Sequence, residues 1–307
     1  EVVISPTLIG LLILYLVTSS YKIQKNELET IKWCILGGGL IASLLTIYRY
    51  SSIEDLHRVT LEFGSRTADI GAFSFSLLLP VSICVEKILK QNSRFLKGLF
   101  CCVLCVIIYC TIITGSRGTA LGVGIIFIVF IMSSKQRITF GIVGIVIGII
   151  LMSAIPDYYF TERWGHAIET GGAGRTSIWY VGLICLKHHW LLGAGLGNFG
   201  NAYEEFAIYA PHFKGYHRAP HNIYLGCFVE LGIIGFSLFI AVLMRHYRVI
   251  RSRFACHDGN QIMLKAVFFA ALVSSFFLDT LYQKSFWLIL MLIMMNRNAG
   301  RYGNSMS

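Results

Sequence analysis

Long apolar runs constrain this chain more than any other feature of its sequence. Hydrophobic residues make up 55% of the 307 residues and only 14% are charged, against about 25% in an ordinary soluble domain. A helix that crosses a bilayer needs about 20 apolar residues, so this inventory would fill about eight such helices. The chain is therefore neither a soluble globular enzyme nor a disordered or fibrous protein. A membrane β-barrel is also excluded, because its strands would alternate polar and apolar residues.

The apolar runs predict nine candidate transmembrane helices. They cover residues 2–20, 31–49, 68–86, 99–114, 118–133, 138–155, 222–244, 262–279 and 281–296. We therefore expect an all-α integral membrane protein, a polytopic bundle of about eight or nine transmembrane helices. Residues 156–221 contain no spanning run, and they predict one large loop.

Positive charges set the expected orientation in the membrane. The loops on the two sides of the membrane alternate along the chain. Of the 26 Lys and Arg residues, 16 lie in the loops of one side, the first being Lys22 and the last Arg301. Five of the other ten belong to residues 156–221, which the positive-inside rule does not count, so the comparison is 16 against five. The first set is expected in the cytoplasm and the long loop on the extracytoplasmic face. The net charge of +10 is thus a topology signal, and we expect no nucleic acid partner.

These two patterns together predict the organisation of the chain. Residues 1–155 are expected to hold transmembrane helices one to six, and residues 156–221 the extracytoplasmic loop with the catalytic elements. Residues 222–296 would hold helices seven to nine, and residues 297–307 a cytoplasmic tail. Six of the nine histidines fall in the loop, which makes it the first place to look for chemistry.

Within the loop, residues 175–190 predict a helix that lies along the membrane surface or against the bundle, with Gly193 as its stop. The following GAGLGNFG contains a formal G-x-G-x-x-G match. A dinucleotide site would need a preceding strand, a following helix and a cytosolic cofactor, and none is expected here. A tight turn that lets the backbone approach a neighbouring helix is favoured, while a turn that binds a phosphate through its N–H groups stays open.

Histidines and arginines supply the candidate chemistry. His217 and His221 are four residues apart, but Pro220 between them breaks the helix that a shared zinc ion would need. His221 lies at the outer edge of a span, where it is suited to proton transfer or is simply an interfacial side chain. Arg117 in TGSRG and Arg175 both face outward, against the charge bias. They predict a bidentate clamp for a diphosphate, with snorkelling as the alternative for Arg117.

No metal or cofactor is expected. The nine cysteines lie mostly in apolar runs, so they predict neither a disulfide framework nor a zinc site. No D-x-D motif occurs to hold a divalent cation.

Four blocks, taken in order, resemble the O-antigen ligase and O-antigen polymerase family. They are TGSRG before a span, GRTSIW, HHWLLGAGLGNFGNAY, and HNIYLGCFVELGIIGF in a span. The resemblance covers about residues 60–295, and Trp190 stands where the family usually has a proline before LLG. Family members are commonly longer, and this chain begins with Glu1, so we expect an N-terminally truncated member.

The resemblance implies a C-type glycosyltransferase-like membrane protein of the bacterial inner membrane, with its active site on the periplasmic face. It would move a glycan from undecaprenyl diphosphate to lipid A core or to a growing polysaccharide, without a metal and with inversion. The matching catalytic positions are Arg117, Arg175 and His221. Residues expected to help bind substrate are Asn222, Arg218, His217 and Arg66.

A solute transporter, for example of bicarbonate, is the alternative from another functional class. A carrier is expected to show charged or broken helices at mid-membrane, often in two matching halves. The predicted spans hold almost no charge apart from Glu230, and no internal repeat is visible. The sequence therefore favours the enzyme.

Overall fold

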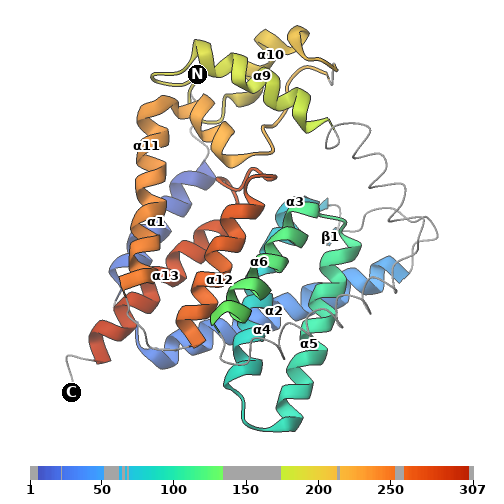
Figure 1. The fold of residues 1–307 in the computed structure, drawn as a ribbon, viewed down its shortest axis with the longest axis vertical. Coiled ribbons are helices and arrows are strands. Elements are labelled where there is room, and N and C mark those ends of the chain that lie inside the picture. The colour runs from blue at the N-terminus through green and yellow to red at the C-terminus, as the bar shows by residue number, and fades with distance from the viewer. Residues whose placement is uncertain are drawn as a thin grey trace. The chain divides into compact units, whose positions relative to one another are not determined.

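The computed structural model describes residues 6–21, 23–51, 62–63, 66–67, 69–133, 174–212, 215–252 and 259–303, which are predominantly helical (Figure 1). The predicted helix at 138–155 and His166 lie outside the described residues. The chain divides into two compact units. Unit 1 comprises residues 1–13, 154–247 and 275–283, and unit 2 comprises residues 14–153, 248–274 and 284–307.

The helical elements follow the apolar runs along the chain. They are α1 (Pro6–Ser20), α2 (Lys25–Ser51), α3 (Ile70–Ser76), α4 (Leu78–Lys90), α5 (Arg94–Ile113), α6 (Arg117–Ser133), α9 (Arg175–His188), α10 (Phe199–Phe206), the 3₁₀ turn η1 (Ala207–Tyr209), α11 (Ile223–Ser252), α12 (Gly259–Ser274) and α13 (Lys284–Gly303). The strands β1 (Glu62–Phe63) and β2 (Arg66–Thr67) form one short antiparallel pair, with Glu62 opposite Thr67 and Phe63 opposite Arg66.

The helical fold class is confirmed, with some boundaries shifted. The run at 68–86 becomes two helices that meet at Leu77, and α13 continues to Gly303, so part of the predicted tail is helical. Four segments are long and apolar enough to cross a membrane: Lys25–Ser51, Ile70–Lys90, Arg94–Ile113 and Ile223–Arg251. Three shorter apolar helices accompany them. The count of eight or nine spans stays a prediction.

Small residues bring the helices of unit 2 together. A Cβ on Gly39 of α2 would lie 2.5 Å from Cγ of Pro80 on α4, and one on Gly122 of α6 would lie 2.3 Å from Oγ of Ser274 on α12. The Ser274 hydroxyl also donates to the carbonyl of Gly118, at 2.9 Å. Such close approach gives membrane helices their van der Waals contact, since burial from lipid supplies little.

A buried ion pair joins α2 to α4 in the same unit. The Lys32 ammonium is 1% exposed and lies 2.6 Å from the Glu86 carboxylate, which is fully buried. Lys32 also donates to Asn260 of α12 at 2.7 Å, and Lys90 lies 2.7 Å from Glu86. Two charged helices, α2 and α4, are thus joined to each other by ion pairs and to α12 by the hydrogen bond to Asn260.

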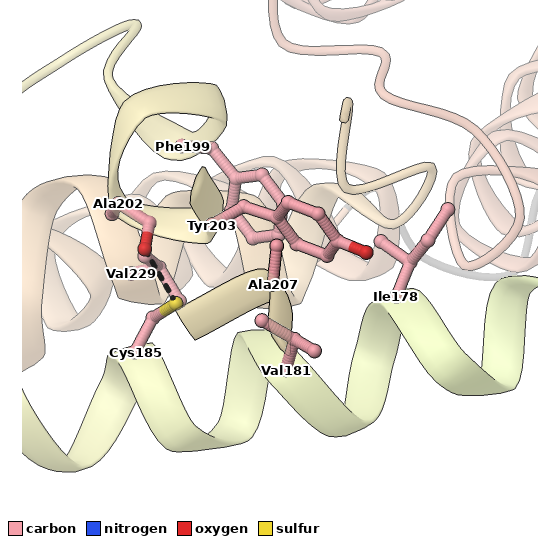
Figure 2. Close-up of a cluster of buried hydrophobic side chains, with 8 residues drawn as sticks. All are labelled: Ile178, Val181, Cys185, Phe199, Ala202, Tyr203, Ala207 and Val229. Carbon is pink, nitrogen blue, oxygen red and sulfur yellow. Dashed lines mark hydrogen bonds between the residues drawn. The ribbon is translucent and has the colours of Figure 1, made fainter. Parts of the chain in front are cut away.

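Unit 1 has its own core, formed by α9, α10, η1 and α11 (Figure 2). The eight buried residues are Ile178, Val181, Cys185, Phe199, Ala202, Tyr203, Ala207 and Val229. On α9 the buried positions recur every three or four residues, as expected for one face of an amphipathic helix. The Cys185 thiol donates to the Ala202 carbonyl at 3.1 Å, which ties α10 to α9. This core seats the loop segment that carries the predicted chemistry.

Candidate active site

The site in unit 1 is built on a break in α11. Gly232 has φ 63° and ψ −172°, so the helical hydrogen bonds cannot continue through it. The glycine turn that follows α9 supplies the missing partners. The amides of Ala194 and Gly195 donate to the carbonyls of Val229 and Glu230 at 2.8 and 2.9 Å, and the Ile233 amide donates to Trp190 at 2.8 Å. A broken apolar helix needs such partners, because lipid offers none.

Glycine is required where the turn meets the break. Gly193 has φ 81°, and a Cβ there would lie 2.2 Å from the Glu230 carbonyl oxygen. A Cβ on Gly232 would lie 2.3 Å from the Leu191 carbonyl oxygen. The predicted close backbone approach is thus confirmed. The predicted stop at Gly193 is wrong, because α9 ends at His188 and the turn begins there.

The Glu230 side chain occupies the centre of this turn. It is 4% exposed, and its carboxylate accepts from the Gly197 amide at 3.0 Å, the Phe199 amide at 3.3 Å and the Tyr282 hydroxyl at 2.9 Å. Phe199 is the first residue of α10, where a negative charge suits the helix dipole. The sequence left open that the N–H groups of this glycine turn bind a phosphate. In the structure they bind the Glu230 carboxylate and the backbone carbonyls of α11 instead.

Helix α10 in turn seats His217. A Cβ on Gly200 would lie 2.7 Å from Cε1 and Nε2 of His217, so the imidazole ring lies directly against this glycine. The His217 Nδ1 lies 3.9 Å from the Glu204 carboxylate, and both side chains are exposed, so this pair stabilises little. Tyr203 of the same helix is fully buried, and its hydroxyl has no hydrogen-bond partner among the described residues. Burial raises the pKa of that hydroxyl.

His221 is held immediately before α11 in a backbone conformation that L-residues seldom adopt. Its φ is 45°, and that of His217 is 39°; both lie in the left-handed region. The His221 side chain is exposed. Each such residue costs of order 1–3 kcal/mol and persists only where the surroundings hold it, often at functional sites. Two histidines at the ends of one five-residue segment share this strain.

A helix cap by Asn222 and hydrogen bonds to two neighbours, Trp179 and Ser275, fix the segment from His217 to Ile223. The Asn222 side chain is buried and caps α11, with Oδ1 accepting from the amides of Tyr224 at 2.9 Å and Leu225 at 3.1 Å. The Trp179 indole donates to the Pro220 carbonyl at 3.0 Å. The Ile223 amide donates to Ser275 at 3.0 Å. The predicted role of Asn222 in substrate binding stays a prediction beside this capping role.

Arg175 lies on the helix whose Trp179 side chain contacts this segment. It is the first residue of α9, after Gly174 in the left-handed conformation, and it is half-buried. Arg175 and Trp179 are four residues apart and so share one face of the helix. Because Trp179 bonds to Pro220, Arg175 lies one turn from the contact that precedes His221. A helix N-terminus that carries a guanidinium combines two features that attract phosphate.

The remaining segment of the site is residues 275–283, which follow the end of α12 at Ser274. The Ser275 and Thr280 hydroxyls lie 2.7 Å apart. Burial, with Glu230 nearby, raises the pKa of Asp279 to about 6. The pKa of Tyr282 is also raised, because burial and the adjacent carboxylate disfavour its anion.

Arg117 belongs to unit 2. It is the half-buried first residue of α6, after Gly115 with φ 63°. The Thr119 hydroxyl lies 2.9 Å from that of Ser74 and 3.0 Å from that of Ser116, which fixes the TGSRG turn. Within the described residues no acidic side chain pairs with Arg117. A cation at a helix N-terminus is opposed by the dipole, so this position favours a bound anion.

The structure thus gathers Arg175, His217, Arg218, His221 and Asn222 in unit 1. Arg218 is exposed, and Arg66 lies in β2. Sequence reasoning did not assign the supporting residues Trp179, Gly200 and Tyr282, although Glu230 is conspicuous as a charge in an apolar run. Groups of three or more His, Cys, Asp or Glu side chains arranged to hold a metal do not occur in the described ranges.

Comparison with protein families agrees with the resemblance seen in the motifs. Residues 100–240 match the family model described as O-Antigen ligase. The matched segment contains all the predicted site residues except Arg66. Among curated proteins, none matches the chain. Residues 100–240, somewhat less than half of the chain, are thus similar to the O-antigen ligase family, whose members carry out glycan transfer of the ligase or polymerase type.

Proposed function

We propose that this protein transfers a glycan from a polyprenyl diphosphate, undecaprenyl diphosphate in bacteria, to a hydroxyl of lipid A core or of a second lipid-linked glycan. The reaction would take place at the outer face of the bacterial inner membrane. The observation that carries the proposal is the Trp179–Pro220 hydrogen bond. It joins the helix that begins with Arg175 to the strained segment that ends at His221. A phosphate-binding group and a proton acceptor thereby belong to one constellation.

In the proposed reaction the acceptor oxygen attacks the anomeric carbon while the bond from that carbon to the diphosphate oxygen breaks. The electron pair of the broken bond leaves with the lipid diphosphate. Arg175 and Arg117 stabilise the negative charge that develops there, where fixed cations act most strongly. His221 takes the proton from the acceptor hydroxyl. A single displacement inverts the anomeric configuration. Arg218, His217, Asn222 and Arg66 are proposed to help bind the substrates.

The test is a transfer assay in proteoliposomes that hold a labelled lipid-diphosphate glycan and both acceptor classes. His221→Ala is expected to lower kcat by about 10²–10⁴-fold, the usual contribution of a general base. His212→Ala, an exposed histidine of the same loop, is the matched control and is expected to keep kcat within twofold. Undiminished transfer by His221→Ala would refute the assignment.

The arginines have their own controls. Arg175→Ala and Arg117→Ala are each expected to abolish most transfer. Arg175→Lys keeps the charge but loses the fork that binds two phosphate oxygens, so it should recover only part of the rate. Lys187→Ala and Arg94→Ala remove exposed cations from α9 and α5 and are expected to leave the rate unchanged.

The break in α11 bears on the transporter alternative. Broken helices in carriers free backbone groups for solute and ions, whereas here the glycine turn takes the groups at Val229, Glu230 and Ile233. No observation on the described residues favours transport. Solute uptake by reconstituted vesicles that persists in His221→Ala would favour it.

A further inference from the structure

Glu230 is a buried acid that the proposed reaction does not use. A carboxylate taken out of water is costly unless it is paired or fully hydrogen-bonded. Glu230 is 4% exposed, and its partners are two backbone amides and one phenol, all of them neutral donors. A glutamine would fit the same volume, but its NH₂ group would face a donor. The three donors therefore select a carboxylate at this position.

One of the two segments held by this carboxylate leads to His217. The Gly197 and Phe199 amides fix the turn and the start of α10 on Glu230. One residue later, Gly200 lies against the imidazole of His217. The start of α10 thus donates a hydrogen bond to Glu230 and also packs against His217, the first of the two strained histidines.

The second segment leads to the other end of the same loop. The Tyr282 hydroxyl donates to Glu230 at 2.9 Å. Tyr282 belongs to residues 275–283, whose first carbonyl, that of Ser275, accepts from the Ile223 amide. Ile223 follows the His221–Asn222 pair directly. The Glu230 carboxylate therefore binds both segments that contact residues 217–223. The start of α10 contacts this stretch at His217, and residues 275–283 contact it at Ile223.

We propose that Glu230 is a positioning residue for His221, holding the His217–Ile223 segment in the geometry that the transfer reaction needs. It acts through α10 and through residues 275–283 and does not touch the substrates. The inference rests on the proposed function. It gives Glu230 of α11 a role in catalysis. A buried carboxylate with only a structural role would not have one.

Hydrogen exchange tests the contacts without reference to activity. The Gly197 and Phe199 amides bind different oxygens of Glu230, so in Glu230→Gln one of them faces an NH₂ group and loses its acceptor. A peptide spanning 196–204 is therefore expected to exchange at least about tenfold faster. A peptide from α9 is expected to be unchanged. Glu205→Gln, an exposed acid on α10, is the matched control and is expected to exchange like the wild type. Unchanged exchange in Glu230→Gln would overturn the inference.

Kinetics test the catalytic part. Small misplacement of a reacting group costs up to about 10²-fold in rate, so Glu230→Gln is expected to lower kcat per folded molecule by about 10–100-fold. The KM for the lipid-linked donor is expected to change less than threefold. Glu230→Asp keeps the charge and should recover part of kcat. Tyr282→Phe removes one of the three donors and should lower kcat by less than Glu230→Gln does. Glu205→Gln should retain full kcat.

The outcomes separate this inference from the proposed function. An active wild type whose kcat is unaffected in both Glu230→Gln and Tyr282→Phe overturns the positioning role alone. An equal loss of stability and activity that Glu230→Asp does not relieve also overturns it, because a purely structural role predicts that result. A wild type that transfers no glycan refutes the proposed function and the positioning role with it, whatever the exchange of residues 196–204.

Discussion

Gly193 is the position at which the contact between the glycine turn and the α11 break can be tested most sharply. In Gly193→Ala the new Cβ would lie 2.2 Å from the Glu230 carbonyl oxygen and 2.5 Å from the Gly232 nitrogen. Both are backbone atoms, so no side chain can move aside. The turn must separate from α11, and the hydrogen bonds at Ala194 and Gly195, along with that from Ile233 to Trp190, are weakened or lost.

The expected cost has two parts. An alanine in the left-handed region costs about 1–2 kcal/mol relative to glycine. Three backbone hydrogen bonds contribute about 0.5–1.5 kcal/mol each to the net free energy of unfolding. Gly193→Ala should therefore destabilise the protein by about 3–6 kcal/mol. The effect should also appear as faster amide exchange over residues 190–199.

Substitutions at two other glycines separate the cost of backbone strain from the cost of the lost hydrogen bonds. Gly197 has φ 78°, but its nearest neighbour to a new Cβ is the Tyr282 hydroxyl at 3.8 Å, so Gly197→Ala should cost only the strain of about 1–2 kcal/mol. Gly98 lies in α5 with open space around it, and Gly98→Ala should stabilise by about 0.5–1 kcal/mol. The free energies come from reversible denaturation in mixed micelles. Equal losses for Gly193→Ala and Gly197→Ala would show that the turn does not contact α11.

Three further predictions concern buried polar groups. Lys32→Met leaves the buried Glu86 with only Lys90, and should destabilise by about 3 kcal/mol, whereas adding Glu86→Leu should restore most of the loss; Lys97→Met at an exposed position should change little in the same denaturation assay. Tyr203→Phe removes a hydroxyl without a partner among the described residues and should be neutral or stabilising by about 1 kcal/mol, contrary to the usual cost of truncating a buried side chain. The pKa of Asp279 is raised to about 6, so the folded protein binds a proton that the unfolded chain releases near pH 4, and stability falls as pH rises through this window. Asp279→Asn should therefore stabilise at pH 7, by no more than about 3 kcal/mol, and have no effect at pH 3.5.

Much of the fold follows from local features of the sequence. Uninterrupted apolar runs predicted helices close to α2, α5, α6 and α11, because a membrane helix must satisfy its hydrogen bonds within itself. A helix close to α9 and the close approach of the glycine turn were also predicted. In each case the signal lies within about 20 consecutive residues.

The break at Gly232 was not predicted, because an isolated glycine is common in apolar helices and does not by itself break one. The partners of Glu230 lie 31 and 33 residues before it and 52 residues after it, and no local pattern connects them. The contacts that the strained segment makes with Gly200 and Trp179 likewise come from residues far away in the sequence. The sequence indicated which side chains have chemistry, while the contacts that hold them come from distant segments.

The chemistry of the product tests the central claim most directly. Purified protein in proteoliposomes receives a labelled glycan on polyprenyl diphosphate, together with an acceptor. We expect one polyprenyl diphosphate released for each glycan transferred, an inverted anomeric configuration in the new linkage, and loss of both products in His221→Ala. Transfer with retained configuration, or at full rate in His221→Ala, would contradict this expectation.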